Sequence, residues 1–120
     1  MPQFVILRHT LPADSERASH FDLMLESGET LLTWAIAELP TKVPTAAEEL
    51  PPHRRAYLDY EGPVSNNRGT VKRIDRGVYE WVRQSADELL ARIEGEQLRG
   101  LLLIQRRHEQ MWEVSLRGET

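Results

Sequence analysis

The sequence predicts a mainly β fold, a compact single-domain β-barrel of short, mostly antiparallel strands with one or two short helical turns. Three observations support this prediction. Apolar residues gather in short runs, and several runs alternate with polar residues in the two-residue period of a strand. Tight turn sequences separate the runs, which is typical of a closed or nearly closed barrel. The 120 residues contain no repeat and no long linker, so we expect one domain over residues 1–120.

The first half of the chain predicts three strands and a long connection. Residues 3–9 form an apolar run, and the polar segment 10–19 predicts a loop. Residues 20–26 turn at Ser27-Gly28-Glu29 into residues 30–37, with the spacing of a hairpin. Four prolines interrupt residues 39–52, which predicts a connection with at most one helical turn, at 45–50.

The second half predicts further short strands, at residues 55–60, 69–75, 77–82, 89–94, 98–106 and 111–117. Within them, Leu101–Ile104 is continuously apolar, which predicts burial on both faces. Ser85 and Glu88 fit a capping box and predict a helical turn at 85–90. The three tryptophans are expected to pack in the core or against the barrel wall; they are Trp34, Trp81 and Trp112.

Composition and charge exclude several classes of protein. No apolar run approaches the roughly 20 residues of a membrane helix and the N-terminus lacks a signal-peptide pattern, so we expect a cytoplasmic protein with no membrane partner. The absence of cysteine excludes disulfides and thiolate metal sites. The net charge of −4 argues against non-specific coating of nucleic acid. A basic cluster could still meet a few phosphates; its members are Arg54, Arg55, Arg68, Lys72, Arg73 and Arg76.

Three residues near the N-terminus form a candidate metal site. His20 and Asp22 alternate on the predicted strand 20–26, so both project from the face opposite Phe21 and Leu23. Positions two apart on a strand lie about 6.6 Å from each other, which lets an imidazole and a carboxylate converge on one ion. With His9 from a neighbouring strand, the set leaves coordination positions open, as catalytic metal sites do. The simpler alternative is a hydrogen-bonded polar pair on an open sheet face.

A second group of polar residues lies in the middle of the chain. His53 and Tyr57 are four residues apart, and considered alone they indicate only a loop histidine and a core aromatic residue. The segment Asn66-Asn67-Arg68-Gly69 predicts a turn that presents backbone N–H groups and an arginine to an anion. A plain hairpin turn is the simpler explanation of that segment.

A series of short motifs follows in a characteristic order. These motifs are Arg8-His9, His20-Phe21-Asp22-Leu23, Leu32-Thr33-Trp34-Ala35-Ile36, Asp59-Tyr60-Glu61-Gly62, Gly69-Thr70-Val71, Asp75-Arg76-Gly77-Val78-Tyr79-Glu80, Ile93-Glu94-Gly95-Glu96 and Leu98-Arg99-Gly100. In this order the chain resembles the 3′-phosphoesterase domain of bacterial DNA ligase D, over about residues 4–112. The resemblance implies a compact β-barrel that, with manganese, trims 3′-terminal ribonucleotides and removes 3′-phosphates at DNA ends during end joining.

The resemblance also implies roles for single residues. His9, His20 and Asp22 fall on the family's metal ligands, and the expected ion is Mn²⁺, with other divalent transition metals as alternatives. His53 and Tyr57 fall on the pair that meets the substrate phosphate, and they are the expected catalytic residues. The implied partners are nucleic-acid 3′ ends and a separate polymerase or ligase of end joining.

Three positions depart from the family's pattern. Met24 stands where the family has an arginine that helps to hold the phosphate, and Glu38 and Pro51 stand where a lysine and a glutamate are expected. Removing a guanidinium contact to phosphate typically costs at least ~2–3 kcal/mol, or about two orders of magnitude in rate. The candidates to supply that contact from elsewhere are Arg8, Arg55 and Arg68.

Two hypotheses of different classes follow. The first is a metal-dependent phosphoesterase acting on nucleic-acid 3′ ends, with His53 as the better candidate for the general acid. The second is a relative that binds DNA ends or a repair partner without turnover, which the departures at 24, 38 and 51 motivate. A non-haem iron oxygenase also uses two histidines and one carboxylate, but nothing else in the sequence indicates a 2-oxoacid site.

Overall fold

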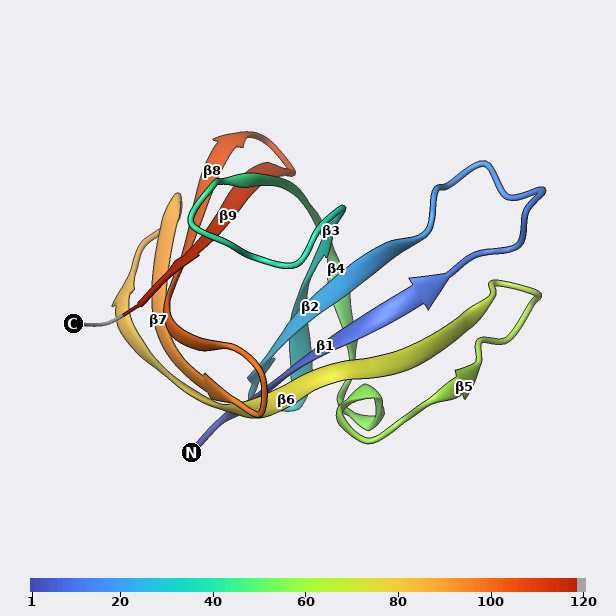
Figure 1. Ribbon diagram of the computed structural model, residues 1–120, viewed down its shortest axis with the longest axis horizontal. Helices are drawn as coiled ribbons and strands as arrows, with labels where there is room; N and C mark the ends of the chain where they lie inside the picture. Colours follow the sequence, from blue (N-terminus) through green and yellow to red (C-terminus); the bar gives the residue numbers. More distant parts are fainter. Residues whose placement is uncertain (119–120) are drawn as a thin grey trace.

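The computed structural model describes residues 1–118, which form a closed ring of antiparallel strands (Figure 1). The strands pair in the order β1-β2-β3-β4-β9-β8-β7-β6, and β6 also pairs with β1, which closes the barrel. Their bounds are β1 Gln3–Thr10, β2 His20–Ser27, β3 Thr30–Ile36, β4 Thr45–Arg54, β5 Gly62–Pro63, β6 Thr70–Gln84, β7 Glu88–Gly95, β8 Arg99–His108 and β9 Met111–Arg117. The predicted antiparallel barrel is therefore confirmed.

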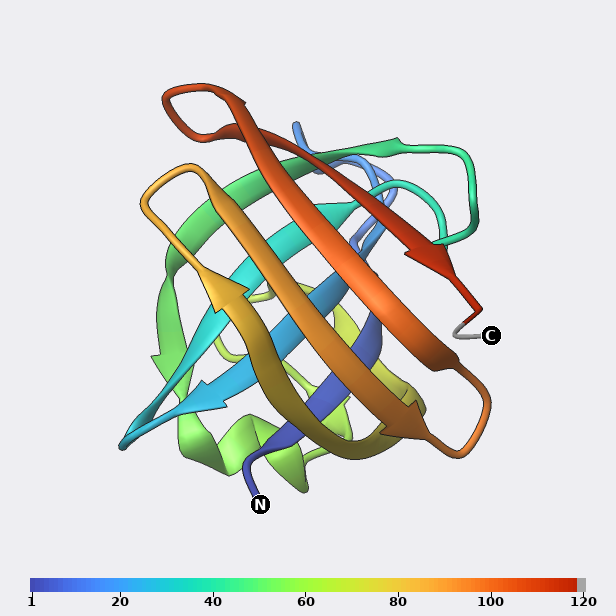
Figure 2. The ribbon, with the colours of Figure 1, turned by 90° about the vertical axis from the view of Figure 1, so that its left-hand side faces the viewer.

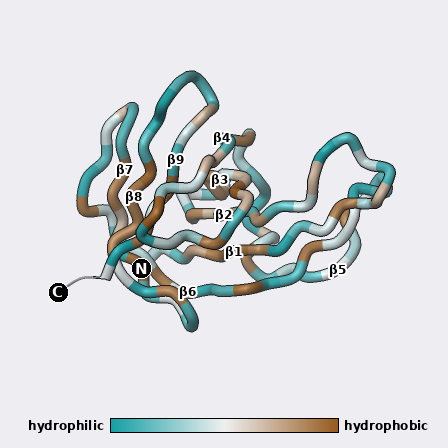
Figure 3. Tube along the Cα trace, turned by 45° about the horizontal axis from the view of Figure 1, so that its top comes forward, coloured by the Kyte–Doolittle hydropathy of each residue, from teal (hydrophilic) through white to brown (hydrophobic). Residues whose placement is uncertain are grey.

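Strands β1, β2 and β3 bury side chains on both faces. Phe4 and Ile6 point into the barrel, whereas Val5 and Leu7 point outward, as the two-residue period of a strand requires. The inward residues belong to the interior core, which contains side chains from β1–β3 and from β7–β9. Figure 2 shows these two sets of strands on opposite sides of the barrel. The outward residues belong to a smaller outer cluster; its members are Val5, Leu7, Met24, Leu31, Leu58, Val64 and Val71. Figure 3 shows the apolar positions recurring along these strands.

Residues 45–54 form strand β4, so the predicted connection with a helical turn at 45–50 is wrong. The strand accommodates its two adjacent prolines in a bulge. Leu31 pairs with His53 and Thr33 pairs with Leu50, which leaves Pro51 and Pro52 together opposite one residue of β3. A proline at a bulge removes no ladder hydrogen bond, because the extra residue is unpaired there. On the other edge of β4, strand β9 pairs only with residues 45–48, so Pro51 and Pro52 have no strand partner on that edge either.

Other local predictions are also corrected. Residues 55–58 form a 3₁₀ helix, η1 (Arg55–Leu58), rather than a strand, and its Leu58 packs into the outer cluster. The two strands predicted at 69–75 and 77–82 are one strand, β6 (Thr70–Gln84), and Gly77 lies within it where the backbone of β7 approaches closely. The run 101–104 is buried only at Leu102 and Ile104, since no second layer covers the outside of β8.

The predicted helical turn at 85–90 is a hairpin turn between β6 and β7. The hydrogen bond that suggested a capping box is present: the Glu88 N–H donates to Ser85 Oγ at 3.1 Å. The turn itself is closed by the Ser85 N–H, which donates to the Glu88 carbonyl oxygen at 2.9 Å, and the residues before and after it pair across the sheet. Within residues 1–118, no helix has the length and apolar character that crossing a membrane requires.

Candidate functional site

The site lies on the outer face of β1 and β2, near the end of the pair. His9 and His20 face each other in the antiparallel register. Leu23 belongs to the interior core, whereas Met24 belongs to the outer cluster. This confirms the predicted alternation, with Asp22 on the outer face between His20 and Met24.

His9, His20 and Asp22 converge around the Asp22 carboxylate. Nδ1 of His9 lies 3.3 Å from Asp22 Oδ2, and Nε2 of His20 lies 3.0 Å from Asp22 Oδ1. One ligand atom from each residue lies within 4.8 Å of the others. Asp22 is 2% exposed and His20 is also buried, so the carboxylate is shielded from solvent by the two rings. Two nitrogens and one oxygen are a donor set that suits a divalent transition metal.

Backbone carbonyls fix the orientation of both imidazoles. His9 donates its Nε2–H to the carbonyl oxygen of Arg68 at 2.7 Å, and His20 donates its Nδ1–H to the carbonyl oxygen of Ala18 at 3.0 Å. A carbonyl can only accept, so in the neutral rings the nitrogens that face Asp22 are unprotonated. Metal-binding histidines are held in this way, with the second ring nitrogen bonded to a carbonyl or carboxylate. The three side chains can therefore bind a metal ion while both rings keep their hydrogen bonds to the backbone carbonyls.

The pKa values of Asp22 and His9 favour the binding of a cation by the cluster. Burial raises the pKa of Asp22, but hydrogen bonds from His20 and His9 outweigh it and lower that pKa to about 2. The hydrogen bond to Asp22 raises the pKa of His9, against the opposing effect of burial. Asp22 is thus ionised near neutral pH and attracts a proton or a metal ion between itself and the rings.

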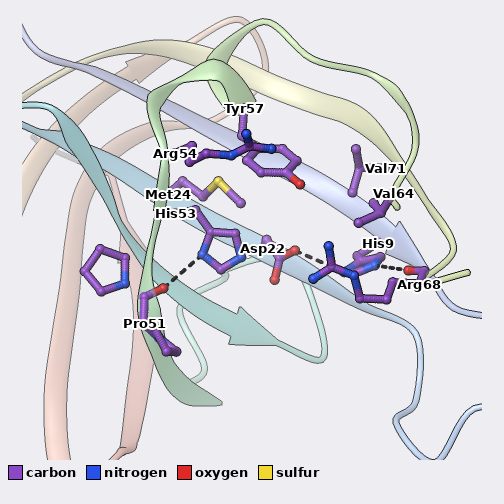
Figure 4. A pocket seen from close by; sticks show the side chains of 11 residues that line it. His9, Asp22, Met24, Pro51, His53, Arg54, Tyr57, Val64, Arg68 and Val71 are labelled. Atoms are coloured by element: carbon purple, nitrogen blue, oxygen red, sulfur yellow. Dashed lines mark hydrogen bonds and ion pairs between the residues drawn. The ribbon is translucent and has the colours of Figure 1, made fainter. Parts of the chain in front are cut away.

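A pocket of about 410 Å³ opens beside the three residues, and we call it the main pocket. His53 from the end of β4 and Tyr57 from η1 both line it, with ring centroids 5.8 Å apart. His53 donates its Nδ1–H to the carbonyl oxygen of Pro51 at 3.0 Å, so its Nε2 is available to the pocket. Figure 4 shows the two rings directed toward the side that holds Asp22 and His9.

A second hollow of about 360 Å³, the side pocket, continues on the other side of the cluster. The loop between β1 and β2 forms one wall of it through Leu11, Ser15 and Arg17. The two pockets share five lining residues: His9, Asp22, Pro51, His53 and Arg68. The candidate metal ligands therefore lie in the middle of a groove rather than at the bottom of a closed cavity.

The three predicted phosphate-binding arginines have different positions. Arg68 lines both pockets, and its guanidinium donates to Ser65 through Nε and Nη2. Arg8 lies on the opposite face of β1, with its guanidinium 4.8 Å from the ring centroid of Phe21. Arg55 donates to Glu26 Oε2 at 2.6 Å and lines neither pocket. The structure thus brings Arg68 to the site and leaves Arg8 and Arg55 outside it.

Sequence reasoning named Arg54 only as one member of the basic cluster, and the structure places it in the lining of the main pocket together with Tyr57. Its three-residue spacing from Tyr57 would have been informative if the 3₁₀ helix had been predicted, since residues three apart lie on one side of such a helix. Of the positions that depart from the family's pattern, Met24 and Pro51 line the main pocket. Glu38 is exposed and lines neither pocket.

Comparison with known protein families gives a match over most of the chain. The DNA ligase D 3′-phosphoesterase domain matches residues 13–118 of this chain. The matched segment contains His20, Asp22, His53 and Tyr57, and it begins after His9. No curated protein matches the chain at a significant level.

Proposed function

This chain belongs to the DNA ligase D 3′-phosphoesterase domain family, and on that premise we propose that it is a metal-dependent phosphoesterase acting on nucleic-acid 3′ ends. The observation that carries the proposal is the pre-oriented set of His9, His20 and Asp22 beside the main pocket. Mn²⁺ is the ion we propose, with other divalent transition metals as alternatives. When bound, such an ion supplies positive charge to a phosphate oxygen and lowers the pKa of a coordinated water.

The remaining residues of the pocket suit the chemistry of phosphate release. Hydrolysis replaces the bond from phosphorus to the 3′ oxygen with a bond to a water oxygen; the water loses a proton and the 3′ oxygen gains one. His53 is the proposed general acid, because its Nδ1–H is bound to Pro51 and a proton on Nε2 would face the pocket. The hydroxyl of Tyr57 is the proposed donor to a phosphate oxygen as negative charge develops.

Part of the lining of the main pocket is apolar. Met24, Val64 and Val71 form this part, and Met24 is only 1% exposed. An apolar wall beside a charged centre suits the sugar and base that carry a 3′-phosphate. We therefore propose a terminal nucleotide as the substrate group. Its source in the cell, a separate polymerase or ligase as partner and a cytoplasmic location stay predictions.

The test is phosphate release from a 3′-phosphorylated primer–template, with and without Mn²⁺. We expect metal-dependent release, and we expect His20→Ala to lower it by at least about three orders of magnitude, since a bound ion contributes several kcal/mol to such reactions. His108→Ala is the matched control, because His108 is a histidine on β8 whose side chain is 80% exposed. Unchanged release in His20→Ala would contradict the proposal.

One observation favours a second candidate, a relative that binds 3′ ends without turnover. On its outer face, β2 supplies Met24 to the main pocket and no cation, so the strand that carries two metal ligands gives the phosphate no guanidinium. This candidate predicts measurable affinity for 3′-phosphorylated ends and no release with any divalent ion. Metal-dependent hydrolysis would exclude it.

A further inference from the structure

We infer that Arg54 is a phosphate-binding residue of the main pocket and that it acts opposite Arg68, supplying the guanidinium that β2 lacks. The inference rests on the proposed phosphoesterase function. Figure 4 shows the two arginines at opposite sides of the pocket, with His53 and Asp22 between them. Neither β1 nor β2 carries Arg54; it comes from the end of β4.

The charge of the pocket creates the need for this residue. The Asp22 carboxylate lines the pocket, 3.3 Å from Nδ1 of His9 and 3.0 Å from Nε2 of His20. A 3′-phosphate brings up to two more negative charges to the same place. Among the described residues, Arg54 and Arg68 are the arginines that line the main pocket, and no lysine lines it. Arginine and lysine side chains therefore offer positive charge to a phosphate in that pocket only from these two positions.

Arg54 is available for a ligand, unlike the arginine next to it. Within residues 1–118, its guanidinium makes no hydrogen bond or ion pair, whereas Arg55 is bound to Glu26. Its backbone is nevertheless held firmly. Arg54 pairs with Thr30 across the sheet and is the N-cap residue of η1. An exposed arginine that the fold fixes at its Cα but leaves unpaired at its tip is suited to bind an anion.

Arg54 also stands beside the proposed phosphate donor Tyr57. Both residues line the main pocket and both line a smaller hollow of about 220 Å³ behind it. Arg54 and Tyr57 thus lie between the main pocket and the smaller hollow. A guanidinium offers two parallel N–H groups to one phosphate, and a phenol adds a third donor, so the pair can hold one phosphate in a single orientation.

Arg68 completes the arrangement from the other side. Its Nε and Nη2 donate to Ser65, which fixes the plane of the guanidinium and leaves Nη1 for a ligand. The carbonyl of the same residue orients His9. Arg68 is therefore a rigid charge tied to a metal ligand, and Arg54 is the adjustable one that closes on the substrate.

The test compares adjacent arginines. Binding of a 3′-phosphorylated primer–template and of its 3′-hydroxyl counterpart is measured without metal and with Mn²⁺, for the wild type, Arg54→Ala, Arg54→Lys and Arg55→Ala; phosphate release is measured in parallel. We expect Arg54→Ala to lower the preference for the 3′-phosphate and kcat/KM by about 100-fold. The slope of log affinity against log salt should fall by about one. Arg54→Lys should keep part of the affinity, because lysine retains the charge without the bidentate geometry.

Arg55→Ala removes the same charge one residue away and should leave both the preference and the rate close to wild type. Equal behaviour of Arg54→Ala and Arg55→Ala would overturn the inference while leaving the phosphoesterase proposal intact. If the wild type releases no phosphate, the phosphoesterase proposal fails, and the binding measurements still decide the role of Arg54. Equal binding of the 3′-phosphorylated and 3′-hydroxyl primer–templates by the wild type would also overturn the inference about Arg54.

Discussion

The two faces of strands β1, β2 and β3 are built from alternate residues of the same strands and do different work. The inner face is apolar at Phe4, Ile6, Leu23 and Leu25, and it packs against β7, β8 and β9. The outer face is apolar near Val5 and Leu7 but becomes polar at His9 and Asp22, where the main pocket opens. One step along the chain, from Asp22 to Leu23, passes from the candidate chemistry to the stabilising core. The candidate ligands thus come from the same strands that build the core, while η1 and the segment with Arg68 complete the pocket around them.

The largest effect should come from Asp22→Asn, on the outer face. The substitution keeps the shape of the side chain but removes the negative charge that holds both histidines and attracts a cation. We expect phosphate release to fall by at least about three orders of magnitude, while the fold is retained. Release is measured at saturating Mn²⁺, and far-ultraviolet circular dichroism checks the fold. A variant that keeps more than a tenth of the wild-type rate would break the comparison.

The neighbouring substitution, Leu23→Ala, should give the opposite result. Leu23 is fully buried in the interior core, and deleting its methyl groups should lower the free energy of unfolding by about 2–5 kcal/mol. The rate of the folded molecules should stay near the wild-type rate, because the side chain does not line either pocket. Urea unfolding gives the first quantity, and release at low temperature gives the second. A large loss of rate without loss of stability would show that the two faces are not independent.

A smaller effect is expected at Tyr79, where the interior core contains a polar contact. Its hydroxyl donates to the Glu26 carbonyl oxygen at 2.6 Å, and the residue is 2% exposed. Tyr79→Phe should cost about 1 kcal/mol of stability at neutral pH, as a lost buried hydrogen bond does. The variant is compared with the wild type by urea unfolding.

The same pair of proteins tests the pKa of Tyr79. Burial, with the negative charge of Glu26 adding to it, raises this pKa from 10.0 to about 12. A raised folded-state pKa means that the contribution of Tyr79 is complete below pH 10 and is lost as pH rises through about 12. The difference in stability between wild type and Tyr79→Phe should therefore shrink over that interval. A difference that stays constant would show that the hydroxyl titrates alike in both states.

The sequence was sufficient for features set by local periodicity. The alternation of His20, Asp22 and Met24 along one strand placed the candidate ligands on one face, and the turn at Gly28 placed the next strand beside them. The same rule excludes Arg8, which is adjacent to His9 and so points to the other face. For residues on the same strand as a candidate ligand, the two-residue period alone thus predicts the correct face of the sheet.

Features that depend on distant partners could not be predicted in this way. Pro51 and Pro52 are compatible with a strand only because β3 and β4 shift register opposite them, and nothing local encodes that shift. Whether Arg54 or Arg55 reaches the pocket depends on where η1 begins. The sequence predicts a strand at 55–60. In a strand, Arg55 would share a face with Tyr57 and Arg54 would point to the other face, which is the reverse of what the structure shows.

The hydrogen bond from His9 to the carbonyl of Arg68 has a consequence for how the protein is made. The two residues are 59 positions apart in the chain. While the polypeptide is being synthesised, β1 and β2 can form a hairpin early, but the carbonyl that orients His9 is delivered only when β6 docks on β1 and closes the ring. Pairing of such distant segments is the slow part of folding for β proteins. A metal ion that binds at the proposed site should therefore be captured late in folding, and its capture would mark the moment at which the barrel is complete.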